Sequence, residues 1–272
     1  GRSRRPNAPK RGADLSQNVN LTFSEAFFGV EKEIEITRDE ICGTCNGKGA
    51  EPGTSTTQCA QCNGRGEIRQ TRQTFLGAMV QVITCPVCKG TGEIITTPCH
   101  TCKGRGIDRK TVRKTVPIPA GVDNGTQIRL AGEGNNGLNG GPNGNLYLEL
   151  RVKAHEFFKR KDNDLLLDLD INVAQATLGA EINIPTMEGT TKLDIPAGTQ
   201  SGKVFRVRNK GFADMRGSTN RGDLVAVINV EVPTHLNAEQ RELFEKLAQT
   251  LGTEVKPQGK GFLDTLKEVF GG

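Results

Sequence analysis

The chain is poor in large aromatic side chains: tryptophan is absent, tyrosine occurs once, and aromatics make up 4% of its 272 residues. It contains no apolar run near the ~20 residues that a membrane-spanning helix needs, and its start carries no signal-peptide pattern. It has only three histidines, and none of them suggests a catalytic triad. These shortages exclude a membrane span and favour a soluble, cytoplasmic, non-enzymatic protein.

Cysteine and glycine are the residues that stand out, with eight of the first and 34 of the second. All eight cysteines belong to four CxxCxGxG repeats, here called knuckles one to four: CGTCNGKG from Cys42, CAQCNGRG from Cys59, CPVCKGTG from Cys85 and CHTCKGRG from Cys99. Two residues between cysteines let both sulfurs reach one tetrahedral ion at about 2.3 Å, while the glycines permit turns that a Cβ would obstruct. The pattern therefore predicts two structural Zn²⁺ ions per chain, in a reducing compartment.

Local topology predicts which knuckles share an ion. Two strand-like runs surround Leu76 and Gly77, so a hairpin returns knuckle three to knuckle two. Extended flanks on either side of the cysteine region bring knuckle one to knuckle four. We expect the first zinc on Cys42, Cys45, Cys99 and Cys102, and the second on Cys59, Cys62, Cys85 and Cys88. Both sites are closed and lack the open position of a catalytic zinc.

Two other functions use CxxC motifs. A thiol–disulfide oxidoreductase is disfavoured, because a redox motif occurs once, at a helix start in an α/β fold. A zinc-ribbon nucleic-acid binder is disfavoured by charge: the formal +5 falls to near +1 once eight thiolates and two zinc ions are counted. Five of the positive charges lie within residues 1–12, which indicates a flexible linker remnant.

An internal repeat organises the rest of the chain. The string IPAG occurs at 118–121 and again at 195–198, and each copy is followed by a turn and an alternating strand. Gly29 lies 92 residues before Gly121, whereas its counterpart Gly179 lies 19 before Gly198, so the first copy carries 73 more residues. All eight cysteines lie in that insertion.

The alternating apolar patterns of both copies predict strands with one buried face. The expected fold is mainly β: two tandem homologous β-sandwich domains, a zinc-knuckle module inserted in the first, and a C-terminal helical segment. Asn237 and Gln240 form a capping box that begins this segment, and its apolar stripe packs either on its own domain or on another copy of the chain. The expected bounds are 1–12 for the linker, 13–40 with 113–154 for the first sandwich, 41–112 for the module, 155–235 for the second sandwich and 236–272 for the helical segment.

These motifs together resemble the DnaJ family of class A J-domain co-chaperones over essentially the whole chain. The resemblance implies a region that binds unfolded client polypeptides, prevents their aggregation and presents them to a DnaK-type chaperone, which works with a nucleotide exchange factor. It also implies a homodimer formed through the C-terminal end, and no nucleic-acid or membrane partner. The family's His-Pro-Asp tripeptide does not occur here, so the expectation is a substrate-binding fragment without the J domain.

The resemblance also implies a client site, a shallow apolar groove beside an exposed strand edge of the first β domain. Such a groove suits unfolded chains, because strand addition supplies hydrogen bonds that do not depend on sequence. Matching by position places five residues in it: Leu15, Ile34, Ile36, Val116 and Phe158. The residues alone favour an ordinary core position for each of them, and only the resemblance places them in a groove.

Overall fold

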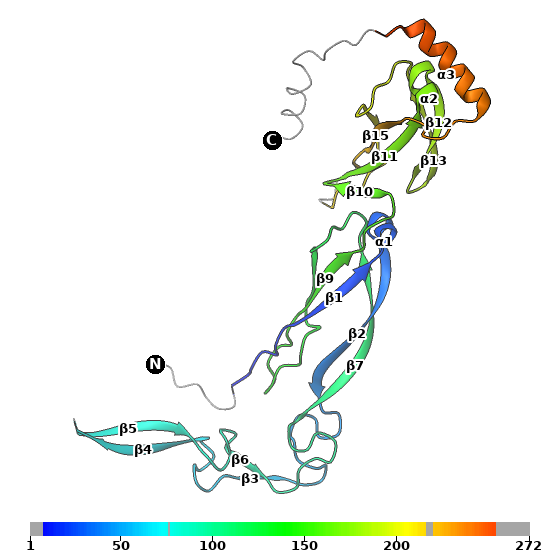
Figure 1. The fold of residues 1–272 in the computed structure, drawn as a ribbon. Helices are drawn as coiled ribbons and strands as arrows, with labels where there is room; N and C mark the ends of the chain where they lie inside the picture. The colour runs from blue at the N-terminus through cyan, green and yellow to red at the C-terminus, as the bar shows by residue number, and fades with distance from the viewer. Residues whose placement is uncertain (1–7, 76, 216–219, 254–272) are drawn as a thin grey trace. The chain divides into compact units, whose positions relative to one another are not determined.

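The computed structural model describes residues 8–75, 77–215 and 220–253 (Figure 1). Strands dominate these residues, so the predicted mainly-β fold is confirmed. The strands before the second copy of the repeat are β1 (Leu15–Leu21), β2 (Val30–Ile41), β3 (Thr56–Gln58), β4 (Glu67–Thr74), β5 (Gly77–Thr84), β6 (Glu93–Ile95), β7 (Ile107–Ile118), β8 (Gln127–Leu130) and β9 (Leu146–Val152). They are followed by β10 (Phe158–Lys161), β11 (Asp164–Asn172), β12 (Ala180–Thr186), β13 (Gly189–Ile195), β14 (Val204–Val207) and β15 (Leu224–Glu231). The helices are α1 (Phe23–Phe28), α2 (Val173–Leu178) and α3 (Ala238–Leu251).

Two compact units divide the chain. The larger comprises residues up to 168 with 183–193 and 204–227, and the smaller comprises 169–182, 194–203 and the described residues from 228 onward. Their edges differ from the expected sandwich boundary at residue 155, and the five domain ranges stay a prediction.

The first copy of the repeat forms two small sheets around one core. β1 pairs in parallel with β9, which pairs antiparallel with β8, so β1 is an edge strand. β2 and β7 form a separate antiparallel ribbon of twelve residue pairs. Alternate residues of these strands are buried, as their period-two pattern predicts. Their shared core comprises Val19, Leu21, Ala26, Ile34, Ile36, Val116, Ile118, Val122, Leu146, Leu148 and Leu150.

The ribbon carries the cysteine insertion. Its last pair joins Ile41 to Ile107, and beyond that pair the main-chain N–H of Cys42 donates to the carbonyl oxygen of Gly106. The insertion therefore leaves and re-enters on adjacent antiparallel strands, as predicted. Within it, β4 and β5 form the expected hairpin around position 76, and β3 pairs with β6.

The second copy of the repeat has the same local structure at its start. Thr22 caps α1 and Asn172 caps α2 by the same reciprocal capping box, and both helices end at a glycine with φ near +80°. At Gly29 and at Gly179, an added Cβ would lie 2.9 Å from the carbonyl oxygen of the isoleucine in the following IPAG string. The correspondence of these glycines is therefore confirmed. The later strands form a sheet in the order β10-β11-β15-β14 and a β12–β13 pair.

Helix α3 begins at the predicted capping box, with Asn237 accepting from the main-chain N–H of Gln240. None of its residues is buried, and the apolar stripe lies open at Leu243, Phe244, Leu247 and Leu251. The remainder of the expected helical segment, 254–272, lies outside the described residues. Among the helices that the structure describes, none is long and apolar enough to cross a membrane.

Candidate metal centres and an apolar hollow

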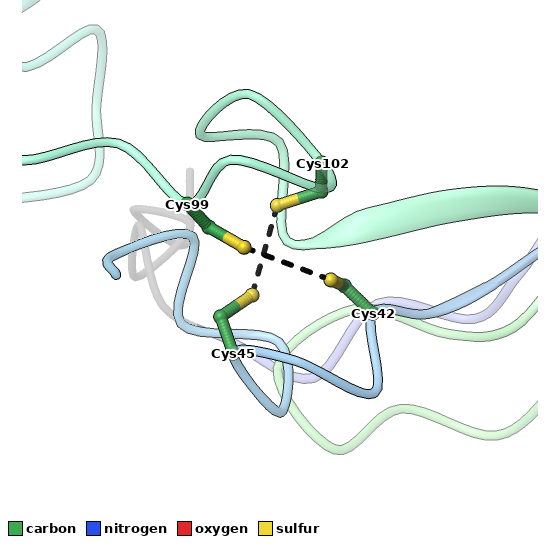
Figure 2. Close-up of side chains that lie close together, drawn as sticks. All are labelled: Cys42, Cys45, Cys99 and Cys102. Carbon is green, nitrogen blue, oxygen red and sulfur yellow. Dashed lines mark hydrogen bonds between the residues drawn. The ribbon is translucent and has the colours of Figure 1, made fainter. Parts of the chain in front are cut away.

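The first cysteine cluster joins knuckles one and four (Figure 2). The Sγ atoms of Cys42 and Cys99 lie 3.9 Å apart, and those of Cys45 and Cys102 lie 3.6 Å apart. A tetrahedral ion with metal–sulfur bonds of about 2.3 Å holds its sulfurs about 3.8 Å from one another. The four buried sulfurs therefore have the spacing that zinc requires.

The second cluster joins knuckles two and three with the same geometry. Cys59 and Cys85 have sulfurs 3.9 Å apart, and Cys62 and Cys88 have sulfurs 3.6 Å apart. All four are buried. The structure thus brings together the same two groups of four that the hairpin argument predicts.

Main-chain amides support the sulfurs in every knuckle. The last glycine of each CxxCxGxG repeat donates its N–H to the sulfur of the second cysteine, at 3.2–3.3 Å: Gly49 to Cys45, Gly66 to Cys62, Gly92 to Cys88 and Gly106 to Cys102. Hydrogen bonds of this kind favour thiolate over thiol, and thiolate is the form that binds metal.

The same glycines also face the partner knuckle. A Cβ on Gly49 would lie 2.6 Å from the carbonyl oxygen of Gly104, and a Cβ on Gly106 would overlap the carbonyl oxygen of Gly47. The two knuckles of a centre therefore pack backbone to backbone. Sequence reasoning assigned these glycines to turns and missed their second role, which depends on the partner knuckle.

The sulfurs of one centre do not share one pKa. Hydrogen bonds, first of all from the main-chain N–H of Cys45, lower the pKa of Cys42 to about 6, whereas burial raises the pKa of Cys45 to about 11. In the second centre, burial raises the pKa of Cys62 to about 11. Burial opposes ionisation of Cys88 too, but the N–H groups of Gly92 and Gly90 outweigh it and lower that pKa to about 6.

A separate hollow of about 310 Å³ lies between β1 and β2. Its lining residues are Leu15, Ser16 and Gln17 from β1, Glu35, Ile36 and Thr37 from β2, and Leu146 from β9. Within the part of the chain that the structure describes, β1 pairs only with β9 and β2 only with β7, so each strand has one edge without a strand partner there. The hollow therefore has a mixed lining of three apolar and four polar residues beside these strand edges.

Hydrogen bonds close both ends of this hollow. At one end the Lys32 ammonium donates to the carbonyl oxygen of Asn20 at 2.7 Å. At the other, Asp39 exchanges hydrogen bonds with Asn135 and Asn136 of the loop between β8 and β9. The part of the hollow between these two sets of hydrogen bonds has the length of one short strand segment.

Of the five residues expected in a client groove, Leu15 and Ile36 line this hollow. Ile34 and Val116 belong to the core beneath it and are 6% and 1% exposed. Phe158 lies elsewhere, in an aromatic cluster with His155 and Phe157, and is 4% exposed. Leu146 lines the hollow and was missed, because the sequence alone does not show that β9 lies beside β1.

Two buried groups of four cysteines on an insertion, with sulfur spacing compatible with zinc, characterise a mainly-β protein with CxxCxGxG knuckles. Comparison with known sequences gives its family. Residues 15–233 match the family described as DnaJ C terminal domain, and residues 239–272 match the chaperone protein DnaJ C-terminal region. The chain therefore belongs to the DnaJ chaperone family, which confirms the resemblance carried by the knuckles and the repeat.

Individual relatives agree with this assignment. The chaperone protein DnaJ of Acetivibrio thermocellus is 46% identical over 263 residues, which cover 97% of this chain and 68% of the relative. Relatives of the same name from Streptococcus agalactiae and Listeria monocytogenes are each 45% identical. These two alignments cover 99% and 100% of this chain, and 73% and 72% of the relatives.

Proposed function

We propose that this chain binds unfolded polypeptides in the hollow between β1 and β2, keeps them from aggregating and presents them to a DnaK-type chaperone. The observation that carries the proposal is the hollow itself, with Leu15, Ile36 and Leu146 beside two strand edges that have no strand partner among the described residues. An unfolded chain offers unpaired main-chain groups and apolar side chains, and this surface complements both.

Binding follows from strand addition. A client segment lies extended along a free edge, so its main-chain groups pair with the strand irrespective of sequence. One apolar client side chain sits against Leu15 and Ile36, and this contact selects segments that a folded protein would bury. Because both ends of the hollow are tied, the bound segment is short and lies within the client chain.

The two cysteine centres fit zinc by donor chemistry and by sulfur spacing, so we assign one Zn²⁺ to each group of four. When bound, zinc supplies a cross-link between knuckles that have little apolar core of their own. In each centre the cysteine sulfurs bind the ion, glycine N–H groups donate hydrogen bonds to the sulfurs, and backbone contact sets the distance between the two knuckles.

Delivery to the partner chaperone and self-association complete the proposal. The relatives are named as DnaJ chaperones, and proteins of that family present clients to a DnaK-type chaperone that works with a nucleotide exchange factor. The open apolar stripe of α3 is the surface by which two copies of the chain associate. We place this activity in the cytoplasm.

The test measures client binding on matched variants. Leu15→Ser removes an apolar contact from a half-buried position, and Val204→Ser makes the same kind of change at an exposed valine of β14. Loss of one apolar anchor of about 1.5–3 kcal/mol should weaken binding of an apolar peptide about tenfold to a hundredfold for Leu15→Ser only. Light scattering of a denatured client should show aggregation suppressed by the parent and by Val204→Ser. Equal peptide affinity in all three proteins would remove the hollow as the client site.

Ile36 and Phe158 are less suitable probes, since they are 2% and 4% exposed. A polar residue at either position costs on the order of 2–5 kcal/mol in a packed core, which would mix folding with binding. Delivery is tested separately. Refolding of the same client with a DnaK-type chaperone, its exchange factor and a J domain should improve when this chain is added, and no improvement would contradict presentation.

A further inference from the structure

The two metal centres differ in what surrounds them. Beside the first centre, Glu51 and His100 lie next to Cys99, and potential ligand atoms of all three residues fall within 4.8 Å of one another. Among the residues that the structure describes, this is the one ligand cluster besides the two groups of four cysteines. The second centre has no counterpart, because the residue at the position of His100 is Gly43 in knuckle one, Ala60 in knuckle two and Pro86 in knuckle three.

Glu51 and His100 are held in place by more than their mutual contact. Oε1 of Glu51 lies 2.7 Å from Nδ1 of His100, and Oε2 accepts the main-chain N–H of His100 at 2.8 Å. The main chain of Glu51 is fixed in turn, since its N–H donates to the carbonyl oxygen of Thr97. A carboxylate and an imidazole nitrogen are thus presented together at the surface, with the His100 side chain 71% exposed.

Cys99 supplies a third donor. Its sulfur is paired across the first centre with that of Cys42, at 3.9 Å. Cys45 and Cys102 each accept a hydrogen bond from the last glycine of their knuckle, whereas Cys99 is the first cysteine of its knuckle and has no such glycine bond among the described residues. A thiolate that binds one zinc keeps lone-pair density for a second soft or borderline cation.

We infer that Glu51, His100 and the shared sulfur of Cys99 form a third metal site, which takes a borderline divalent cation such as Zn²⁺, Cd²⁺ or Co²⁺ on the outside of the first centre. The cation binds Nδ1 and Oε1 in place of the hydrogen bond between them, the ring proton then lies on Nε2, and water completes the coordination. With bonds of about 2.0–2.3 Å, Nδ1 and Oε1 have to move apart from 2.7 Å to about 3.3 Å, and the ligand atoms that now lie up to 4.8 Å apart have to approach by about 1 Å. The exposed His100 side chain makes this movement by breaking its hydrogen bond to Glu51. Mixed nitrogen, oxygen and sulfur donors suit these cations and disfavour Mg²⁺ and Ca²⁺.

This inference rests on the proposed zinc at the first centre, because the shared sulfur bridges the two ions. The test separates the two claims by counting. The full chain is loaded with ¹¹³Cd²⁺ until both four-sulfur centres are filled, and further cadmium is added while bound metal is measured by equilibrium dialysis. We expect two tight equivalents followed by a third, weaker one.

Two variants decide whether the third equivalent occupies this site. His100→Ala removes the imidazole and keeps the main-chain N–H that donates to Glu51. This variant therefore retains the structural hydrogen bond of Glu51 and loses only the imidazole ligand. Glu51→Gln keeps the shape and removes the charge. Each should weaken the third equivalent at least about tenfold and leave the first two in place. The matched controls Glu93→Gln, near the second centre, and His235→Ala should bind all three as the parent does.

Cadmium NMR tests the bridge. Adding the third equivalent should shift the resonance of the first centre, introduce ¹¹³Cd–¹¹³Cd coupling through the shared sulfur, and leave the second centre unchanged. A parent that stops at two equivalents would overturn the inference, and so would a third equivalent that persists in both variants, which marks an adventitious ion only. A third equivalent without a shift at the first centre would exclude Cys99. Fewer than two tight equivalents would instead refute the zinc assignment itself.

Discussion

Knuckle one offers a graded set of glycine substitutions that tests how a centre holds its metal. Gly43 has no positive φ, and an added Cβ there meets nothing within 4 Å. Gly47 has φ +84°, and a Cβ there would lie in ordinary contact, 3.5 Å from the side chain of Ile41. Gly49 has φ +75°, and its Cβ would lie 2.6 Å from the carbonyl oxygen of Gly104 in knuckle four.

The expected losses rise along this series. Gly43→Ala should leave zinc affinity unchanged. Gly47→Ala forces an alanine into the left-handed region at a cost of about 1–2 kcal/mol. Strain in a site whose metal binding is coupled to folding weakens metal binding by the same free energy, so we expect roughly fivefold to thirtyfold weaker zinc binding at the first centre.

Gly49→Ala carries the same strain and a collision as well. Restoring an ordinary contact of about 3.5 Å requires knuckles one and four to separate by about 0.9 Å. Metal sites tolerate deviations of only about 0.2 Å in ligand distance. We therefore expect Gly49→Ala to weaken the first centre at least another tenfold beyond Gly47→Ala.

The assay is competition with a chromophoric chelator, which reports the two zinc ions of each chain separately by affinity. The second centre serves as an internal reference, since Gly49 does not contact it. Equal losses for Gly47→Ala and Gly49→Ala would show that backbone contact between knuckles does not set the sulfur spacing. A loss at the second centre would show that the two centres are not independent.

Three further predictions concern the rest of the chain. Leu247→Asp on the open stripe of α3 should shift sedimentation towards the monomer without lowering the unfolding midpoint, and an unchanged mass would contradict the dimer surface. Glu133→Gln should cost about 1–2 kcal/mol of unfolding free energy at pH 7, because Lys114 and Arg38 lower the pKa of the Glu133 carboxyl. That difference between variant and parent is present above the ordinary pKa of 4.5 and should shrink as pH falls through the lowered value, and a constant difference in denaturant melts down to pH 3 would contradict it. Removal of zinc by a chelator should expose the insertion to protease while hydrogen exchange in β9 stays slow, and equal exposure of both would refute a separately folding module.

Patterns with local causes were predictable from the sequence. The capping box at Asn237 acts over three residues, and the β4–β5 hairpin follows from two short runs around one turn. The cysteine grouping came from this hairpin together with the flanking strands. Each of these depends on neighbours in the chain or on a repeat, which one sequence shows directly.

Features that depend on contacts between distant segments were not predictable. The composition of the glycine-rich stretch at 132–145 predicts a flexible connection. In the structure, however, Leu138 exchanges main-chain hydrogen bonds with Lys10, and the main-chain N–H of Asn135 donates to the carbonyl oxygen of Ala13. The same bonds hold residues 10–13, which the sequence assigns largely to a flexible linker. Composition indicates how flexible a segment is in isolation, whereas hydrogen bonds to distant segments determine whether it is ordered in the folded protein.

The candidate groove shows the same limit. An alternating strand reveals which residues share a face, so Ile34 and Ile36 could be placed together. Both belong to the core, and the finding that Ile36 also borders a hollow depends on where β1 and β9 lie, which is a property of the packed sheets.

The nesting of the two centres has a consequence for synthesis on the ribosome. The outer pair of knuckles spans 57 residues between Cys42 and Cys99, and the inner pair spans 26 between Cys59 and Cys85. All four inner ligands are made before Cys99 and Cys102, and the 14 residues from Cys88 to Cys102 take about a second or more to translate. The inner centre can therefore close while the outer one still lacks half of its ligands. Once it has closed, the outer loop shortens from 57 to about 31 free residues, which lowers its closure cost by about 0.5 kcal/mol. The order in which the ligands emerge and the order that loop entropy favours are the same, and both favour closure of the inner centre before the outer one.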